Sequence, residues 1–201
     1  MTLSASYRGM WKSISRYWQD YGGWRDFCSS PLFHFSIICA TVSYSVWMKP
    51  EWNDLPLSLL PNLLGFSLGA YALIFSLADE RLLAALNVPT TDGSPTKLRM
   101  INATFLHFIL VQTIAIIFAL MNKSTFLIDL SGIIFGGNIG FRNNIDVFLS
   151  GSAGFIGYFL TVYAVALLIG AALAAYRLAI LSGRAASISQ QSEAPQPPTS
   201  V

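Results

Sequence analysis

Long apolar runs, separated by short polar or charged segments, dominate the hydrophobic pattern of this chain. The clearest run extends from Leu55 to Ala78 without a charged residue and ends at Asp79-Glu80-Arg81. A helix of that length exceeds the roughly 20 residues that cross a bilayer. Three other runs are similar in character, although less uniform. We therefore predict four transmembrane helices, at residues 31–48, 56–78, 100–121 and 155–177.

The first 26 residues have a different, amphipathic pattern. Aromatic and apolar residues recur at spacings of three and four, which places them on one helical face, and basic residues lie largely opposite. The apolar face carries Tyr7, Trp11, Ile14, Trp18 and Tyr21, and the other face carries Arg8, Lys12 and Arg16. This pattern favours an interfacial helix in residues 1–26, lying on the membrane. The alternative is a partly ordered tail that docks on its own protein.

Two stretches fit neither pattern. Residues 126–140 are apolar but short and glycine-rich, and they contain Asp129; a re-entrant loop, a surface helix and a buried irregular segment all remain open. Residues 150–154 suggest an irregular or interfacial start to the last span. Residues 182–201 are rich in Ser, Gln, Ala and Pro, which predicts a disordered tail after a transmembrane domain at residues 27–181.

Small residues form stripes on two predicted spans. Because lipid supplies no hydrophobic force between helices, association in a membrane depends on close packing, which small residues allow. The candidate helix-packing residues are Gly65, Gly69, Ala72 and Ser76 on the second span and Gly157, Thr161 and Ala164 on the fourth. Whether these seams lie within one chain or between copies stays open at this point.

Composition strengthens the assignment to a membrane. Of 201 residues, 54% are hydrophobic and 11% are charged, against about 25% charged in soluble domains. A net charge of +2 without a basic patch argues against a nucleic-acid partner. With four spans, nine of the twelve Lys and Arg residues fall on the side of both termini. The positive-inside rule then predicts cytoplasmic termini, in a plasma membrane that we take to be a bacterial inner membrane.

The sequence offers little chemistry. No nucleophile elbow, Walker A loop, dinucleotide fingerprint or zinc-protease motif is present, so we expect no catalytic residues and no cofactor. The two cysteines, Cys28 and Cys39, lack metal-site spacing, and with only two histidines we expect no metal site. The candidates for a polar interior are Asn62, Asn102, His107, Gln112 and Asp129.

Three functions are consistent with this pattern. The first is a non-enzymatic membrane anchor, sensor or regulatory subunit that self-associates into a homo-oligomer and contacts a cytoplasmic protein. The second is an oligomeric pore or transporter subunit for small ions or solutes. The third, an intramembrane enzyme, lacks an identifiable set of acid, base and nucleophile. The sequence thus predicts an all-α integral membrane protein, a bundle of four transmembrane helices, and favours the first function.

Overall fold

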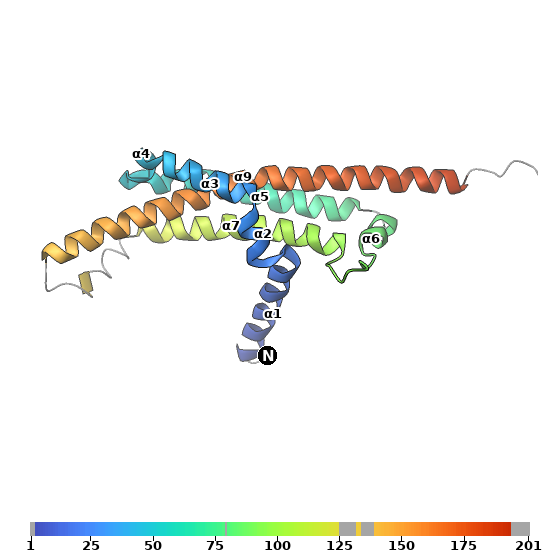
Figure 1. Ribbon diagram of the computed structural model, residues 1–201, viewed down its shortest axis with the longest axis horizontal. Helices are drawn as coiled ribbons and strands as arrows, with labels where there is room; N and C mark the ends of the chain where they lie inside the picture. Colours follow the sequence, from blue (N-terminus) through green and yellow to red (C-terminus); the bar gives the residue numbers. More distant parts are fainter. Residues whose placement is uncertain (1–2, 79, 125–131, 134–138, 194–201) are drawn as a thin grey trace, which may run out of the picture.

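The computed structural model describes residues 3–78, 80–124, 132–133 and 139–193, and over these residues the protein contains helices and no strand (Figure 1). The prediction of an all-α fold is confirmed. In chain order the elements are α1 (Leu3–Tyr21), α2 (Gly23–Ser29), α3 (Pro31–Val42), α4 (Tyr44–Trp47), the 3-10 helix η1 (Pro50–Asn53), α5 (Asp54–Leu77), α6 (Glu80–Leu86), α7 (Lys97–Lys123) and α9 (Ile139–Glu193).

Three helical segments among the described residues are long and apolar enough to cross a membrane. They are Pro50–Ser76, Lys97–Lys123 and Asn143–Gly183. The second and third include the spans predicted at 100–121 and 155–177, and the first covers the span predicted at 56–78 except for its last two residues. The helices α5, α7 and α9 run side by side along the long axis of the molecule, while α1 projects across that direction (Figure 1). The core between them is built from Leu60, Phe105, Phe108, Tyr163 and Ala164.

The first predicted span, at 31–48, is not one continuous helix. Helix α3 ends at Val42, and Ser43 separates it from the single turn of α4. The indole nitrogen of Trp47 donates to the carbonyl of Ala40 over 2.7 Å, so a backbone acceptor at the break has a side-chain partner. Over the described residues, the bundle therefore contains three long helices and one short, interrupted helical pair.

Helices α3 and α4 together pack along only part of α9. Near one end, a Cβ built on Gly170 would lie 3.5 Å from Leu32; near the other, the rings of Trp47 and Phe155 are 5.6 Å apart. These contacts span about 15 residues of α9, or roughly 23 Å at the α-helical rise. That length is less than the hydrocarbon thickness of a typical bilayer, roughly 30 Å.

Helix α9 is longer at both ends than the sequence predicts. It begins at Ile139 and runs through residues 150–154, where an irregular start was expected, and it continues to Glu193, so residues 182–193 are helical rather than disordered. Alanines at 185 and 186 favour a helix, and prolines follow at 195, 197 and 198. Residues 194–201 and most of residues 126–140, including Asp129, lie outside the described residues.

Candidate functional site

The most elaborate group of polar contacts forms where α1 meets the bundle. Two side chains of α1, Tyr17 and Asp20, contact residues of α7. One of these α7 residues, His107, also contacts Tyr163 of α9. We call this group the α1 contact site; it consists of Tyr17, Asp20, Arg99, His107 and Tyr163. It joins parts of the chain that are 56 to 90 residues apart in sequence.

His107 is the centre of the α1 contact site. Its Nδ1 lies 2.6 Å from the hydroxyl of Tyr17, and its Nε2 lies 3.0 Å from the hydroxyl of Tyr163. A neutral imidazole has one donor and one acceptor nitrogen, so one tyrosine donates and the other accepts. Tyr21 stacks on the ring at 4.0 Å between centroids, and only 3% of His107 is exposed. Both ring nitrogens are therefore used to hold α1 and α9 on α7.

Burial also fixes the protonation state of the tyrosines that α1 contributes. It raises the pKa of Tyr17 far above the ordinary value of 10.0, and the neighbouring Tyr21 adds to that rise. Burial raises the pKa of Tyr21 as well. Both phenols stay neutral at physiological pH, so they act as hydrogen-bonding and stacking groups rather than as bases.

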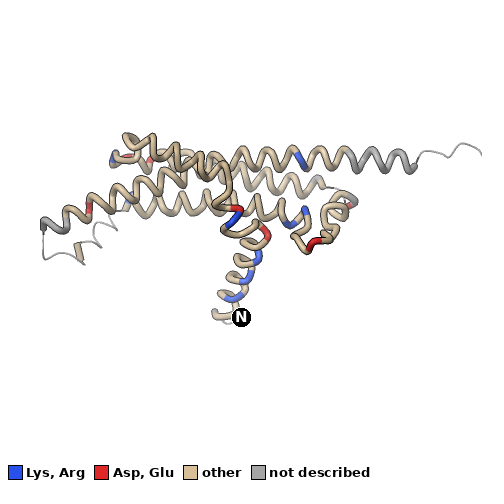
Figure 2. The backbone as a smooth tube through the Cα atoms, in the orientation of Figure 1, with Lys and Arg blue, Asp and Glu red and all other residues tan. Residues whose placement is uncertain are grey.

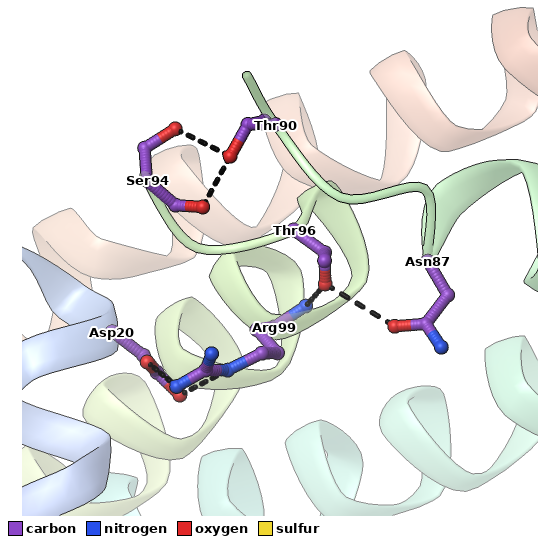
Figure 3. Close-up of polar contacts among 6 residues, drawn as sticks. All are labelled: Asp20, Asn87, Thr90, Ser94, Thr96 and Arg99. Atoms are coloured by element: carbon purple, nitrogen blue, oxygen red, sulfur yellow. Dashed lines mark hydrogen bonds and ion pairs between the residues drawn. The ribbon is translucent and has the colours of Figure 1, made fainter. Parts of the chain in front are cut away.

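An ion pair forms the outer part of the site. The Nη2 of Arg99 lies 2.5 Å from Oδ1 of Asp20 and its Nε lies 3.1 Å from Oδ2, a two-bond arrangement of guanidinium and carboxylate (Figure 3). Asp20 is largely buried, with 11% of its side chain exposed, whereas 49% of the Arg99 side chain is exposed. The ion pair fixes the rotation of α1 relative to the first turn of α7.

The loop before α7 is tied to the same turn. Thr96 caps the helix: its hydroxyl accepts from the backbone amide of Arg99 at 3.4 Å and donates to Oδ1 of Asn87 at 3.4 Å (Figure 3). The hydroxyl of Ser94 donates to Asp92 over 2.7 Å, and hydrogen bonds from Ser94 lower the pKa of the Asp92 carboxyl. The start of α7 thus connects α1 and the α6–α7 loop.

The structure separates the residues predicted to form a polar interior. Asn102 accepts from the hydroxyl of Tyr71 at 3.1 Å, and Gln112 is fully buried 3.4 Å from the hydroxyl of Ser67. Asn62 is exposed and donates to a backbone carbonyl one turn earlier in its own helix. Asp129 lies outside the described residues. Asn102, His107 and Gln112 therefore make three separate contacts from α7 rather than one polar channel.

The two stripes of small residues also lie in different surroundings. On α9, Thr161 and Ala164 are buried, and a Cβ built on Gly157 would lie 2.0 Å from the ring of Trp52. On α5, a Cβ on Gly65 or Gly69 would meet nothing within 4 Å. Ala72 and Ser76, which continue that stripe, are exposed. The α9 stripe packs within the chain, and the α5 stripe faces away from the rest of the described chain.

Sequence reasoning missed Tyr17, Asp20, Arg99 and Tyr163. In the predicted amphipathic helix, Tyr17 lies at the edge of the apolar face and Asp20 outside it, and Tyr163 is one apolar residue among many in its span. The signal for an attached helix is the spacing of three between Tyr17 and Asp20, in the mostly basic and aromatic segment of residues 1–26. That signal does not identify the partner on α7.

Together these features define a class: an all-helical protein with three helices that could each cross a membrane, and with polar side chains used for contacts between helices. The described residues include no group of three or more His, Cys, Asp or Glu side chains that could hold a metal ion. No family model, curated protein or solved structure matches this chain.

Proposed function

We propose that this protein is a non-enzymatic, multi-pass protein of the plasma membrane that acts as an anchor, sensor or regulatory subunit. The membrane we propose is the inner membrane of a bacterium. The observation that carries the proposal is the α1 contact site. Its buried tyrosine and histidine side chains are occupied by each other, and its carboxylate is occupied by Arg99. Such an arrangement holds a helix in place, because the buried polar groups satisfy one another.

The distribution of charge supports a membrane location. Long stretches of α5, α7 and α9 carry no Lys, Arg, Asp or Glu, and blue residues gather along α1 and near the start of α7 (Figure 2). In this proposal α3 and α4 form a short fourth crossing, which a locally thinner bilayer accommodates. Both termini then lie in the cytoplasm, and α1, which projects across the bundle, lies in the cytoplasmic interface (Figure 1).

Self-association is the second part of the proposal. Gly65 and Gly69 lie on an exposed face of α5 with no neighbouring atom where a Cβ would stand, so another helix could approach that backbone closely. We propose that a second copy of this chain packs there. The exposed side chain of Arg8 on α1 and the α6–α7 loop would then remain available to a cytoplasmic protein partner.

A mass measurement tests self-association. The G65L/G69L double variant should reduce the protein to a monomer in mild detergent, because a leucine side chain separates the two backbones. Light scattering with correction for bound detergent measures the protein mass. The matched control is G151L, since Gly151 also has no neighbour within 4 Å of a Cβ but lies on α9. An unchanged mass in the double variant, or the same change in G151L, would argue against this interface.

The pore alternative has less support from the geometry. The buried polar side chains of α7 contact Tyr17, Tyr163 and Ser67 inside the chain rather than an axis shared between copies. We therefore expect proteoliposomes that contain the protein to show no more ion flux than empty liposomes. Flux well above that background would favour the pore.

A further inference from the structure

A groove opens beside the α1 contact site, between α1, α5 and α7. Its volume is about 720 Å³. From α1 it is lined by Lys12, Ser13 and Arg16, and from α7 by Asn102, Leu106 and Ile109. Tyr17, Asp20 and Arg99 of the α1 contact site also line this groove, and the proposed self-association uses a different face.

The outer part of the groove is cationic. Lys12 and Arg16 lie one turn apart on α1 with exposed side chains. Within the described part of the chain, the ion pairs are Arg99 with Asp20 and Lys123 with Asp54, so neither Lys12 nor Arg16 has an acidic partner there. Asp20, the acidic residue in the groove, already binds Arg99 through two hydrogen bonds. An anionic oxygen group would therefore complement Lys12 and Arg16.

The inner part of the groove is apolar. Asn102, Leu106 and Ile109 follow each other along one face of α7, in the direction from its charged first turn toward the middle of the helix. Leu106 is 41% exposed although it lies next to the attached α1. The groove thus changes from cationic to apolar along α7. A phospholipid changes in the same order, from an anionic headgroup that would meet the cationic part to an acyl chain that would meet the apolar part.

We propose that this groove binds an anionic phospholipid of the cytoplasmic leaflet. The phosphate lies between Lys12 and Arg16, and an acyl chain follows Leu106 and Ile109. Basic pockets beside transmembrane helices on the cytoplasmic side are known to take such headgroups. Free inorganic phosphate shares the headgroup chemistry, but it would leave the apolar half of the groove without a ligand. The inference rests on the proposed membrane location and not on self-association.

Native mass spectrometry of the full chain in detergent tests this inference. The protein is titrated with phosphatidylglycerol and, separately, with phosphatidylcholine of the same acyl chains. We expect the wild type to bind the anionic lipid selectively. In the K12Q/R16Q variant, we expect the affinity for this lipid to fall by about 10- to 30-fold, because that is the typical effect of losing two basic residues near a membrane surface. The control variant R25Q/K49Q removes the same charge from exposed positions outside the groove.

Each remaining result has a defined meaning. Equal affinity for both lipids, or an equal loss in R25Q/K49Q, would overturn the proposal, because binding would then reflect general charge or apolar contact. Displacement of the lipid by millimolar inorganic phosphate would show a free-anion site and would also overturn it. Circular dichroism must show unchanged helix content in both variants. A protein that requires detergent for extraction but fails these lipid tests would retain the proposed location without the lipid site.

Discussion

At the scale of single residues, His107 determines how α1 is held. It is buried, hydrogen-bonded through both ring nitrogens and stacked on Tyr21. In the H107F variant, the hydroxyls of Tyr17 and Tyr163 lose their hydrogen bonds to the imidazole, and a buried polar group left unpaired costs about 1–3 kcal/mol. We expect trypsin to cleave within residues 8–25 faster than in the wild type, because α1 leaves the bundle more often.

The matched control for this substitution is H34F. His34 is exposed, and its Nδ1 contacts only the carbonyl of Ser30 one turn earlier in the sequence, at 2.9 Å. Cleavage of α1 in H34F should match that in the wild type. Equal protection of α1 in H107F and H34F would contradict the role assigned to His107.

Tyr17 gives a prediction for pH. Because burial raises its pKa in the folded state, its contribution to stability is fully present below the unfolded pKa of about 10 and is lost as the pH rises further. The difference in tyrosinate absorbance between wild type and Y17F should therefore appear only well above pH 10. A difference that develops around pH 10 would show that Tyr17 is accessible to water and that α1 is not docked.

Gly157 gives a prediction for packing. The G157A variant places a Cβ where the ring of Trp52 lies, and we expect it to lower the free energy of unfolding by about 1–3 kcal/mol. The matched control is G151A on the same helix, where space is open and a change within about 1 kcal/mol is expected. Thermal denaturation in detergent, followed by circular dichroism, measures both. Equal stability of G157A and G151A would contradict the tight contact.

At the scale of elements, the attachment of α1 combines a buried hydrogen-bonded part with an ion pair whose arginine side chain is half exposed. Since half of the Arg99 side chain is exposed, its pairing with Asp20 should contribute only about 0.2–1 kcal/mol. A double-mutant cycle with D20N and R99Q, read from trypsin cleavage of α1, measures that coupling. A coupling energy well above 2 kcal/mol would mean that the ion pair, rather than His107, dominates the attachment.

The same scale shows what the sequence could predict. Uninterrupted apolar runs identified α5, α7 and the central part of α9 because charges at their ends mark the limits of each run. The break at Ser43 could not be predicted, since neither Gly nor Pro marks it and the compensating contact comes from Trp47. The early start of α9 was missed because helical packing at Gly154 and Gly157 against Trp47 and Trp52 depends on residues about 100 positions away.

The candidate site was less predictable than the fold. Polar residues on α7 were identified as candidates for the interior, but the sequence does not show that Asn102, His107 and Gln112 have three different partners. Periodicity places residues on a helical face and does not state which helix lies opposite. Only the docking of α1 identifies Tyr17 and Asp20 as contact residues.

At the scale of the whole molecule, the described residues form three long apolar helices, a short interrupted helical pair and a helix that projects across the bundle. Basic residues gather on α1 and near the start of α7, and long apolar stretches separate them from the opposite end (Figure 2). This asymmetry suits a bundle with one cationic side facing anionic lipid headgroups. The proposed self-association and the proposed lipid site both depend on the location of this bundle in a membrane.

The proposed function requires that the chain cross the bilayer four times, with α3 and α4 as the shortest crossing. The most direct test is to fuse a reporter that is active only in the cytoplasm to the N-terminus in one protein and to the C-terminus in another. The account predicts activity from both fusions. Activity from one fusion and its absence from the other, with both proteins inserted, would mean an odd number of crossings and would contradict the account.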